Sequence, residues 1–308
     1  SSTNLTVGSV TGPSNITNSE GTAGNRTFTI GTDGTSPAAY SGVISNGTAT
    51  SVSLTKTGGV TLILTGSNTY TGTTTISAVT LQLGATNVIS NSSNFILSGG
   101  TFRSGATTGF SETVGTLSLS ASSTIALGTG NHTITFANSS GASWSAGQTL
   151  TITGWTGTAG ASGTAGKIMV GVGGLTSTQL SQITFSGFTA GAMILSTGEL
   201  VPALQNPILA ISGTLNNGSS CINTAATSQT YTITNTGAAA SGISVVSNNA
   251  QFVVSNVSST TIPANGSATF KVTFTPTSSG PQSATITVSS TTSGSNSPPS
   301  KLAGTGNA

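Results

Sequence analysis

Short runs in which apolar residues alternate with Thr or Ser, each closed by Gly or Asn, fill most of this chain. Segment 60–64, for example, has the sequence Val-Thr-Leu-Ile-Leu, and the turn residues Gly-Ser-Asn follow it at 66–68. A period of two places alternate side chains on one face of a strand, and Gly and Asn favour the turns between strands. The pattern therefore predicts an all-β protein built from many short strands.

The spacing of these strands changes near Pro202 and Pro207. In residues 1–203 the strands are short and recur in units of about 20 residues or more, which is typical of a right-handed parallel β-helix. A β-sandwich is the alternative for this part, because a period of two does not distinguish parallel from antiparallel pairing. In residues 204–308 roughly seven strands occupy about 100 residues, which predicts an Ig-like β-sandwich.

The same alternation predicts which side chains face inward. In the second domain, strand 269–274 turns its aromatic and Val side chains to the core and Lys271 to solvent. One helical turn is expected at 175–180, with Thr176 or Ser177 as the N-cap. In the first domain, the expected inward columns are formed by Val60, Leu62, Leu64, Ile76, Leu81 and Leu83.

Residues 56–84 resemble the autotransporter-associated β-strand repeat, which is common in large secreted bacterial surface proteins. They have a Gly-rich entry, an apolar strand, a Gly-x-Asn-Thr-Tyr-x-Gly corner at 66–72 and two further strands. Val79 stands where that family usually has Gly, so the bend there is expected to be made differently. The resemblance implies a β-helix passenger domain.

Residues 206–308 resemble the bacterial Ig-like modules of the choice-of-anchor D or ASH type. The resemblance rests on Thr-Ile-Thr-Asn-Thr-Gly at 232–237, Ile-Pro-Ala-Asn-Gly-Ser at 262–267 and the closing Gly-Thr-Gly at 304–306. Such modules are non-catalytic parts of multidomain surface proteins, which implies a structural role for this domain.

Reactive side chains are scarce, with six Lys or Arg, four Asp or Glu, one His and one Cys in 308 residues. Enzymes depend on such groups, so we expect no catalytic residue, no cofactor and no metal site. A degenerate polysaccharide lyase or hydrolase is the enzyme alternative. It would need two neighbouring carboxyl groups among the four acids, which are Glu20, Asp33, Glu112 and Glu199.

His132 and Cys221 each occur without a second residue of their type. His132 shares the parity of Ile134 and Phe136, so we expect it to face inward at a strand end and to bond to the backbone. Cys221 cannot form an internal disulfide and is expected to be a small buried side chain, with an intermolecular disulfide as the alternative.

The charge pattern and the first residues bear on partners and location. Without a Lys/Arg cluster we expect no nucleic-acid binding, and without an apolar run of about 20 residues we expect no membrane span. The chain starts at Ser1 and has no basic-then-apolar signal segment, so we expect a mature extracellular or cell-surface protein whose signal peptide has been removed. Low charge gives little repulsion between copies, which is compatible with self-association.

Together these features favour a non-enzymatic structural protein, the subunit of a bacterial surface fibre or filament assembled head to tail as a homopolymer. Its self-assembly strand is expected within residues 1–12, with Leu5, Val7 and Val10 as the pairing residues; a frayed or self-capping terminus is the alternative. The other function class is a monomeric adhesin stalk that binds surface glycans. Trp144 and Trp155 would then stack on sugar rings, although packing is favoured for both.

Overall fold

The structure is a computed structural model that describes residues 4–20, 23–34, 38–204, 206–213, 215–292 and 297–308. The chain divides into two compact units, Ser1–Ala203 and Leu204–Ala308, each with its own hydrophobic core. Nearly all regular structure in the described residues is β-strand, as expected from the alternating pattern. None of the helical structure in the described part of the chain is long and apolar enough to cross a membrane.

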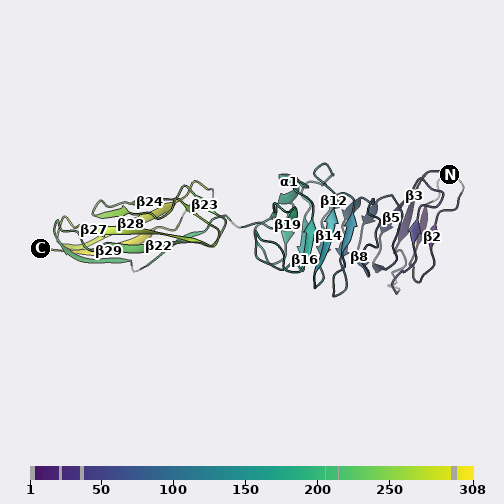
Figure 1. Cartoon of the computed structure of the whole chain (residues 1–308), viewed down its shortest axis with the longest axis horizontal. Helices are drawn as coiled ribbons and strands as arrows, with labels where there is room; N and C mark the ends of the chain where they lie inside the picture. The colour runs from purple at the N-terminus through teal and green to yellow at the C-terminus, as the bar shows by residue number, and fades with distance from the viewer. Residues whose placement is uncertain (1–3, 21–22, 35–37, 205, 214, 293–296) are drawn as a thin grey trace. The chain divides into compact units, whose positions relative to one another are not determined.

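The first unit is a parallel β-helix, which confirms the predicted fold, and its coils stack side by side in Figure 1. Neighbouring strands of its first sheet pair in parallel, and successive partners lie about 20 to 26 residues apart in the chain. Each coil therefore adds one strand to this sheet. In spatial order the strands are β1 (Leu5–Val7), β3 (Asn25–Ile30), β5 (Ser51–Lys56), β7 (Thr74–Ile76), β9 (Phe95–Ser98) and β12 (Leu117–Ala121).

Two further sheets complete the coils. The second sheet is parallel throughout and contains β6 (Thr61–Leu64), β8 (Thr80–Leu83), β10 (Thr101–Arg103), β13 (Ser123–Ala126), β15 (Leu150–Thr153) and β17 (Ile183–Phe185). The third contains β11 (Glu112–Val114), β14 (His132–Phe136), β16 (Gly166–Met169), β19 (Glu199–Pro202) and β18 (Ala192–Ile194). A two-stranded parallel sheet, β2 (Ile16–Thr17) with β4 (Ile44–Ser45), accompanies the first coils.

The corner motif at residues 66–72 is explained by contacts between coils. Asn68 Oδ1 accepts a hydrogen bond from Ile44 N at 2.7 Å, and Asn68 Nδ2 donates to Val88 O at 2.6 Å, so this side chain joins the preceding and following coils. Gly72 lies so close to Val52 O that a Cβ there would be 2.5 Å from it. The predicted inward columns are confirmed, because all six of their residues are buried.

Val79 makes the bend at which the resembling family has Gly. It adopts a φ of +44°, a left-handed conformation that is strained for a β-branched residue. Its side chain is 40% exposed, so little burial offsets the strain. The bend is therefore made in the left-handed conformation that favours glycine although the residue is valine, and the expectation that it differs from the family's bend stays a prediction.

The second unit is an Ig-like sandwich of two four-stranded sheets, as predicted. One sheet contains β20 (Leu209–Ser212), β22 (Gln229–Asn235), β27 (Ser267–Phe274) and β25 (Phe252–Ser255), all antiparallel. The other contains β21 (Asn216–Cys221), β29 (Ser300–Asn307), β28 (Gly280–Ser289) and β24 (Ser244–Ser247), and β23 (Ala240–Ser241) pairs separately with β26 (Thr261–Ile262).

The structure corrects two expectations in this unit. Strand β21 was not predicted; its sequence Asn-Asn-Gly-Ser-Ser-Cys lacks strand-forming residues, and it forms through parallel backbone pairing with β29. Cys221 at its end is a free, exposed thiol and not a buried apolar side chain. Within β27 the expected faces are correct, since the alternating apolar residues are buried and Lys271 is exposed.

Candidate functional site at the N-terminal end of the solenoid

The C-terminal end of the solenoid is covered by its own chain. Strand β19 pairs antiparallel with both β16 and β18, so the parallel stacking stops there. The predicted helical turn is α1 (Ser177–Ser181), and Thr176 is its N-cap. Thr176 Oγ1 accepts from Gln179 N, and Gln179 Oε1 accepts in turn from Thr176 N, which forms a capping box.

The N-terminal end carries no comparable cover among the described residues. In the part of the chain that the structure describes, the edge strand β1 at this end is paired on one side only, with β3. Leu5 in β1 is 50% exposed, whereas Val7 and Val10 are half-buried and pack on the core. The structure thus places Leu5 and Val7 in the edge strand and Val10 just beyond it; residues 1–3 of the predicted segment lie outside the described residues.

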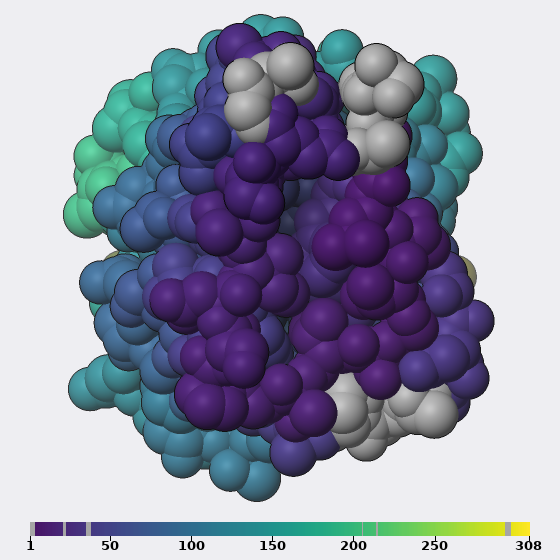
Figure 2. Space-filling model, turned by 90° about the vertical axis from the view of Figure 1, so that its right-hand side faces the viewer, coloured from purple at the N-terminus to yellow at the C-terminus, as the bar shows by residue number. Residues whose placement is uncertain are grey.

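A hollow opens at this end, visible between the N-terminal segments in Figure 2. Its volume is about 80 Å³, and it lies between β1, β3 and β5 on one side and β2 and β4 on the other. Its lining mixes apolar with polar residues: Leu5, Ile16, Phe28 and Val52 with Arg26, Thr17, Asn18, Thr27 and Ser45. The end of the lumen is therefore partly open and lined by both kinds of side chain.

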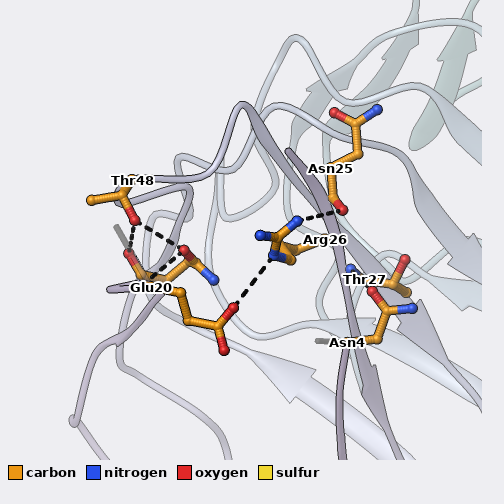
Figure 3. Close-up of polar contacts among 7 residues, drawn as sticks. Asn4, Glu20, Asn25, Arg26, Thr27 and Thr48 are labelled. Atoms are coloured by element: carbon orange, nitrogen blue, oxygen red, sulfur yellow. Dashed lines mark hydrogen bonds and ion pairs between the residues drawn. The ribbon is translucent and has the colours of Figure 1, made fainter. Parts of the chain in front are cut away.

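Arg26 shares the inward parity of Phe28 and Ile30, and its side chain is buried at the mouth of this hollow. Its Nε lies 3.7 Å from Glu20 Oε2, and its Nη1 donates to Asn25 O at 3.3 Å (Figure 3). Nearby, Asn4 Oδ1 accepts from Thr27 N at 3.0 Å, which fixes the start of the chain against β3.

Exposed negative charge within the described residues is confined to this end. Glu20 is exposed beside Arg26. Asp33 is also exposed, and its carboxylate lies against Gly8, directly after β1. The other two acids, Glu112 and Glu199, are buried.

The two buried carboxylates have structural partners. Glu112 Oε2 accepts from Val88 N at 2.8 Å and Ile89 N at 3.1 Å, and burial raises the pKa of this carboxyl to about 7 despite these hydrogen bonds. Glu199 accepts from Gly163 N at 2.8 Å and from Ser162 Oγ at 2.6 Å. Both therefore tie loops to the solenoid, and neither of these contact sets includes a second acid.

His132 faces inward and bonds to the backbone, as its parity predicts. Its Nδ1 lies 2.9 Å from Gly130 O, which makes Nδ1 the donor there, so Nε2 accepts from Ser104 Oγ at 2.9 Å. Ser104 has no solvent exposure and accepts from Gly128 N at 2.8 Å. No sequence signal pointed to Ser104, and its burial leaves no path for a substrate. The described residues also hold no group of three or more His, Cys, Asp or Glu suited to a metal ion.

The two Trp residues differ in exposure. Trp155 is buried, and Phe185 and Phe188 pack against its ring in edge-on geometry at 5.7 and 5.2 Å between centroids. This packing occupies the ring that a sugar would need. Trp144 is half-buried, and its Nε1 donates to Leu117 O at 3.0 Å.

An open groove runs across three successive coils on the flank of the solenoid. Its volume is about 440 Å³. The exposed side chain of Arg103 stands at one edge, and Thr107, Thr129 and Thr153 supply hydroxyl groups. This groove was not predicted from the sequence, because its walls come from strand ends and loops of different coils.

Comparison with known proteins gave two family matches. Residues 54–83 match the passenger-associated-transport repeat, and residues 207–304 match the HYDIN/CFA65/VesB-like Ig-like domain. A search of curated proteins found no match. The first match agrees with the autotransporter-repeat resemblance; the choice-of-anchor D assignment of the second unit stays a prediction. A passenger repeat followed by an Ig-like domain indicates a surface-exposed structural or adhesin-like protein.

Proposed function

We propose that this chain is a non-enzymatic structural protein of the bacterial cell surface, the subunit of a secreted fibre that assembles head to tail. The observation that carries this proposal is the difference between the two solenoid ends: one is covered by β18, β19 and α1, whereas the other presents the apolar edge strand β1. Backbone groups on a free edge are a template for pairing with another chain. Leu5 and Val7 are the proposed pairing residues, with Val10 packing behind them.

Electron microscopy of the native protein at neutral pH tests this function. We expect filaments with one subunit repeated along the axis. Leu5→Asp places a charge on an already exposed position, so the fold should survive while filaments are lost. Val172→Asp, at another exposed apolar residue, is the matched control and should leave filaments intact. Isolated particles of the unchanged protein at every concentration would rule the fibre out.

The flank groove supports a second candidate function, a monomeric adhesin stalk. A guanidinium beside several hydroxyl groups suits an acidic glycan. A glycan array with the unchanged protein and with Arg103→Ala tests it. Binding of acidic glycans that disappears in the variant would support the adhesin, and an array without signal would exclude this role for the groove.

A further inference from the structure

The second unit also has a free strand edge. Among the described residues, β25 is hydrogen-bonded in its sheet only to β27, and its residues Phe252–Ser255 include no charge and no proline. Val253 in this strand is 52% exposed. Natural proteins usually protect edge strands with Lys, Pro or a bulge, and β25 carries none of these.

The edge strand β21 on the other sheet is different. Its pairing with β29 shifts register between Asn216 and Ser219, and Gly218 has a φ of +74°. Such a bulge disturbs the ladder that an incoming strand would extend. Of these two edges, β25 is therefore the better acceptor.

Charge distinguishes β25 further. In the β25–β27 ladder Ser255 pairs with Lys271, and both side chains are exposed. A strand added to β25 would lie about 10 Å from β27, two strand spacings away, which a lysine and a carboxylate side chain can cover between them. Lys271 and Lys301 are the charged residues of residues 204–308, which contain no Asp or Glu.

The exposed carboxylates and these lysines thus occupy different parts of the same chain. Glu20 and Asp33 flank β1 and β3 at the solenoid end, and Lys271 lies beside β25. Complementary patches at two distinct places on one chain favour a head-to-tail contact between copies, because a two-fold contact would put like charges together.

We propose that β1 of one copy adds to the free edge of β25 in the next copy, with Glu20 and Asp33 of the first facing Lys271 of the second. This junction rests on the proposed fibre function and names its acceptor. It would join the six-stranded sheet that ends at β1 to the four-stranded sheet that ends at β25.

Cysteine cross-linking between two single-cysteine proteins tests the junction. Both carry Cys221→Ser; one adds Thr6→Cys in β1, and the other adds Val253→Cys or Ser255→Cys in β25. After mixing and mild oxidation we expect a disulfide dimer containing one chain of each kind. Thr287→Cys, exposed on β28, is the control acceptor. If the yield of disulfide dimer with Val253→Cys and Ser255→Cys is no higher than with Thr287→Cys, the junction is overturned.

Charge reversal in the otherwise unchanged chain gives an independent test, in which the strength of association between copies is measured. Lys271→Glu should weaken association about two- to fivefold, as expected for exposed ion pairs. Adding Asp33→Lys to the same chain should restore it, because every copy supplies both sides of the junction. Lys301→Glu is the matched control and should have a smaller effect. If filaments form but neither the β1–β25 cross-link nor the effect of Lys271→Glu is observed, this junction is overturned and the fibre function stands. If no assembly is observed, both are overturned.

Discussion

The Tyr70 hydroxyl lies 2.6 Å from Thr74 Oγ1, and both side chains are fully buried. Thr74 Oγ1 lies in turn 2.8 Å from Ser93 Oγ, which donates to Gly72 O at 2.7 Å. This chain of hydroxyl groups starts at the tyrosine of the repeat motif and runs into the next coil. The motif therefore stabilises stacking between coils.

Tyr70→Phe should lower the free energy of unfolding of the solenoid by about 1–2 kcal/mol, because it removes one buried hydrogen bond with almost no change in volume. Urea denaturation monitored by circular dichroism measures the change. Thr75→Val, on the outward face of the same strand, should stay within about 0.5 kcal/mol of the unchanged protein. Equal effects of the two substitutions would contradict the role of the hydroxyl chain.

Val79→Gly should stabilise the solenoid by about 1 kcal/mol. Glycine adopts the observed φ of +44° without steric strain, and the gain exceeds the entropy that glycine loses on folding. Val172→Gly provides the control, because Val172 is also exposed but has no positive φ. The melting temperature should rise for Val79→Gly and stay level or fall for Val172→Gly. A fall for both variants would show that Val79 is not strained.

Glu112 should make stability depend on pH. Burial raises its pKa from 4.5 to about 7 in the folded chain, so the folded state binds this proton more tightly than the unfolded chain does. Its stabilising contribution is complete below about pH 4.5 and is lost as the pH rises to about 7. The difference amounts to about 3 kcal/mol.

Glu112→Gln removes this titration, so the variant should lose less stability than the unchanged protein between pH 4.5 and pH 8. The urea denaturation midpoint of each protein, measured at several pH values across that range, reports its stability. Parallel curves for the two would mean that another group is responsible for any pH dependence.

Lys56 occupies an inward position of β5 with no solvent exposure, and its Nζ donates to Thr57 O. Burial lowers the pKa of this ammonium because its charged form loses hydration. Lys56→Met should therefore raise the free energy of unfolding by about 1 kcal/mol or more at pH 7. Lys301→Met, at an exposed position, should change it little; a loss of stability in the Lys56 variant would show that the buried ammonium is well compensated.

Local patterns were sufficient to predict the repeating parts of the fold. Period-two alternation predicted the inward columns, and a cap at Thr176 or Ser177 predicted α1, whose N-cap is Thr176. Strand β21 could not be predicted, because its polar residues form a strand only where β29 supplies backbone partners. The hollow at the N-terminal end also escaped prediction, since Arg26 and Ile16 come together only when the coils stack.

The first coil is attached through short ladders. It is held to the next coil through three residue pairs in β1–β3 and two in β2–β4, whereas six pairs join β3 to β5. Under tension along the coil axis these short ladders should rupture before the β3–β5 ladder does. In a fibre joined at this end, the first coil would then yield and re-form while β3 and β5 stay paired.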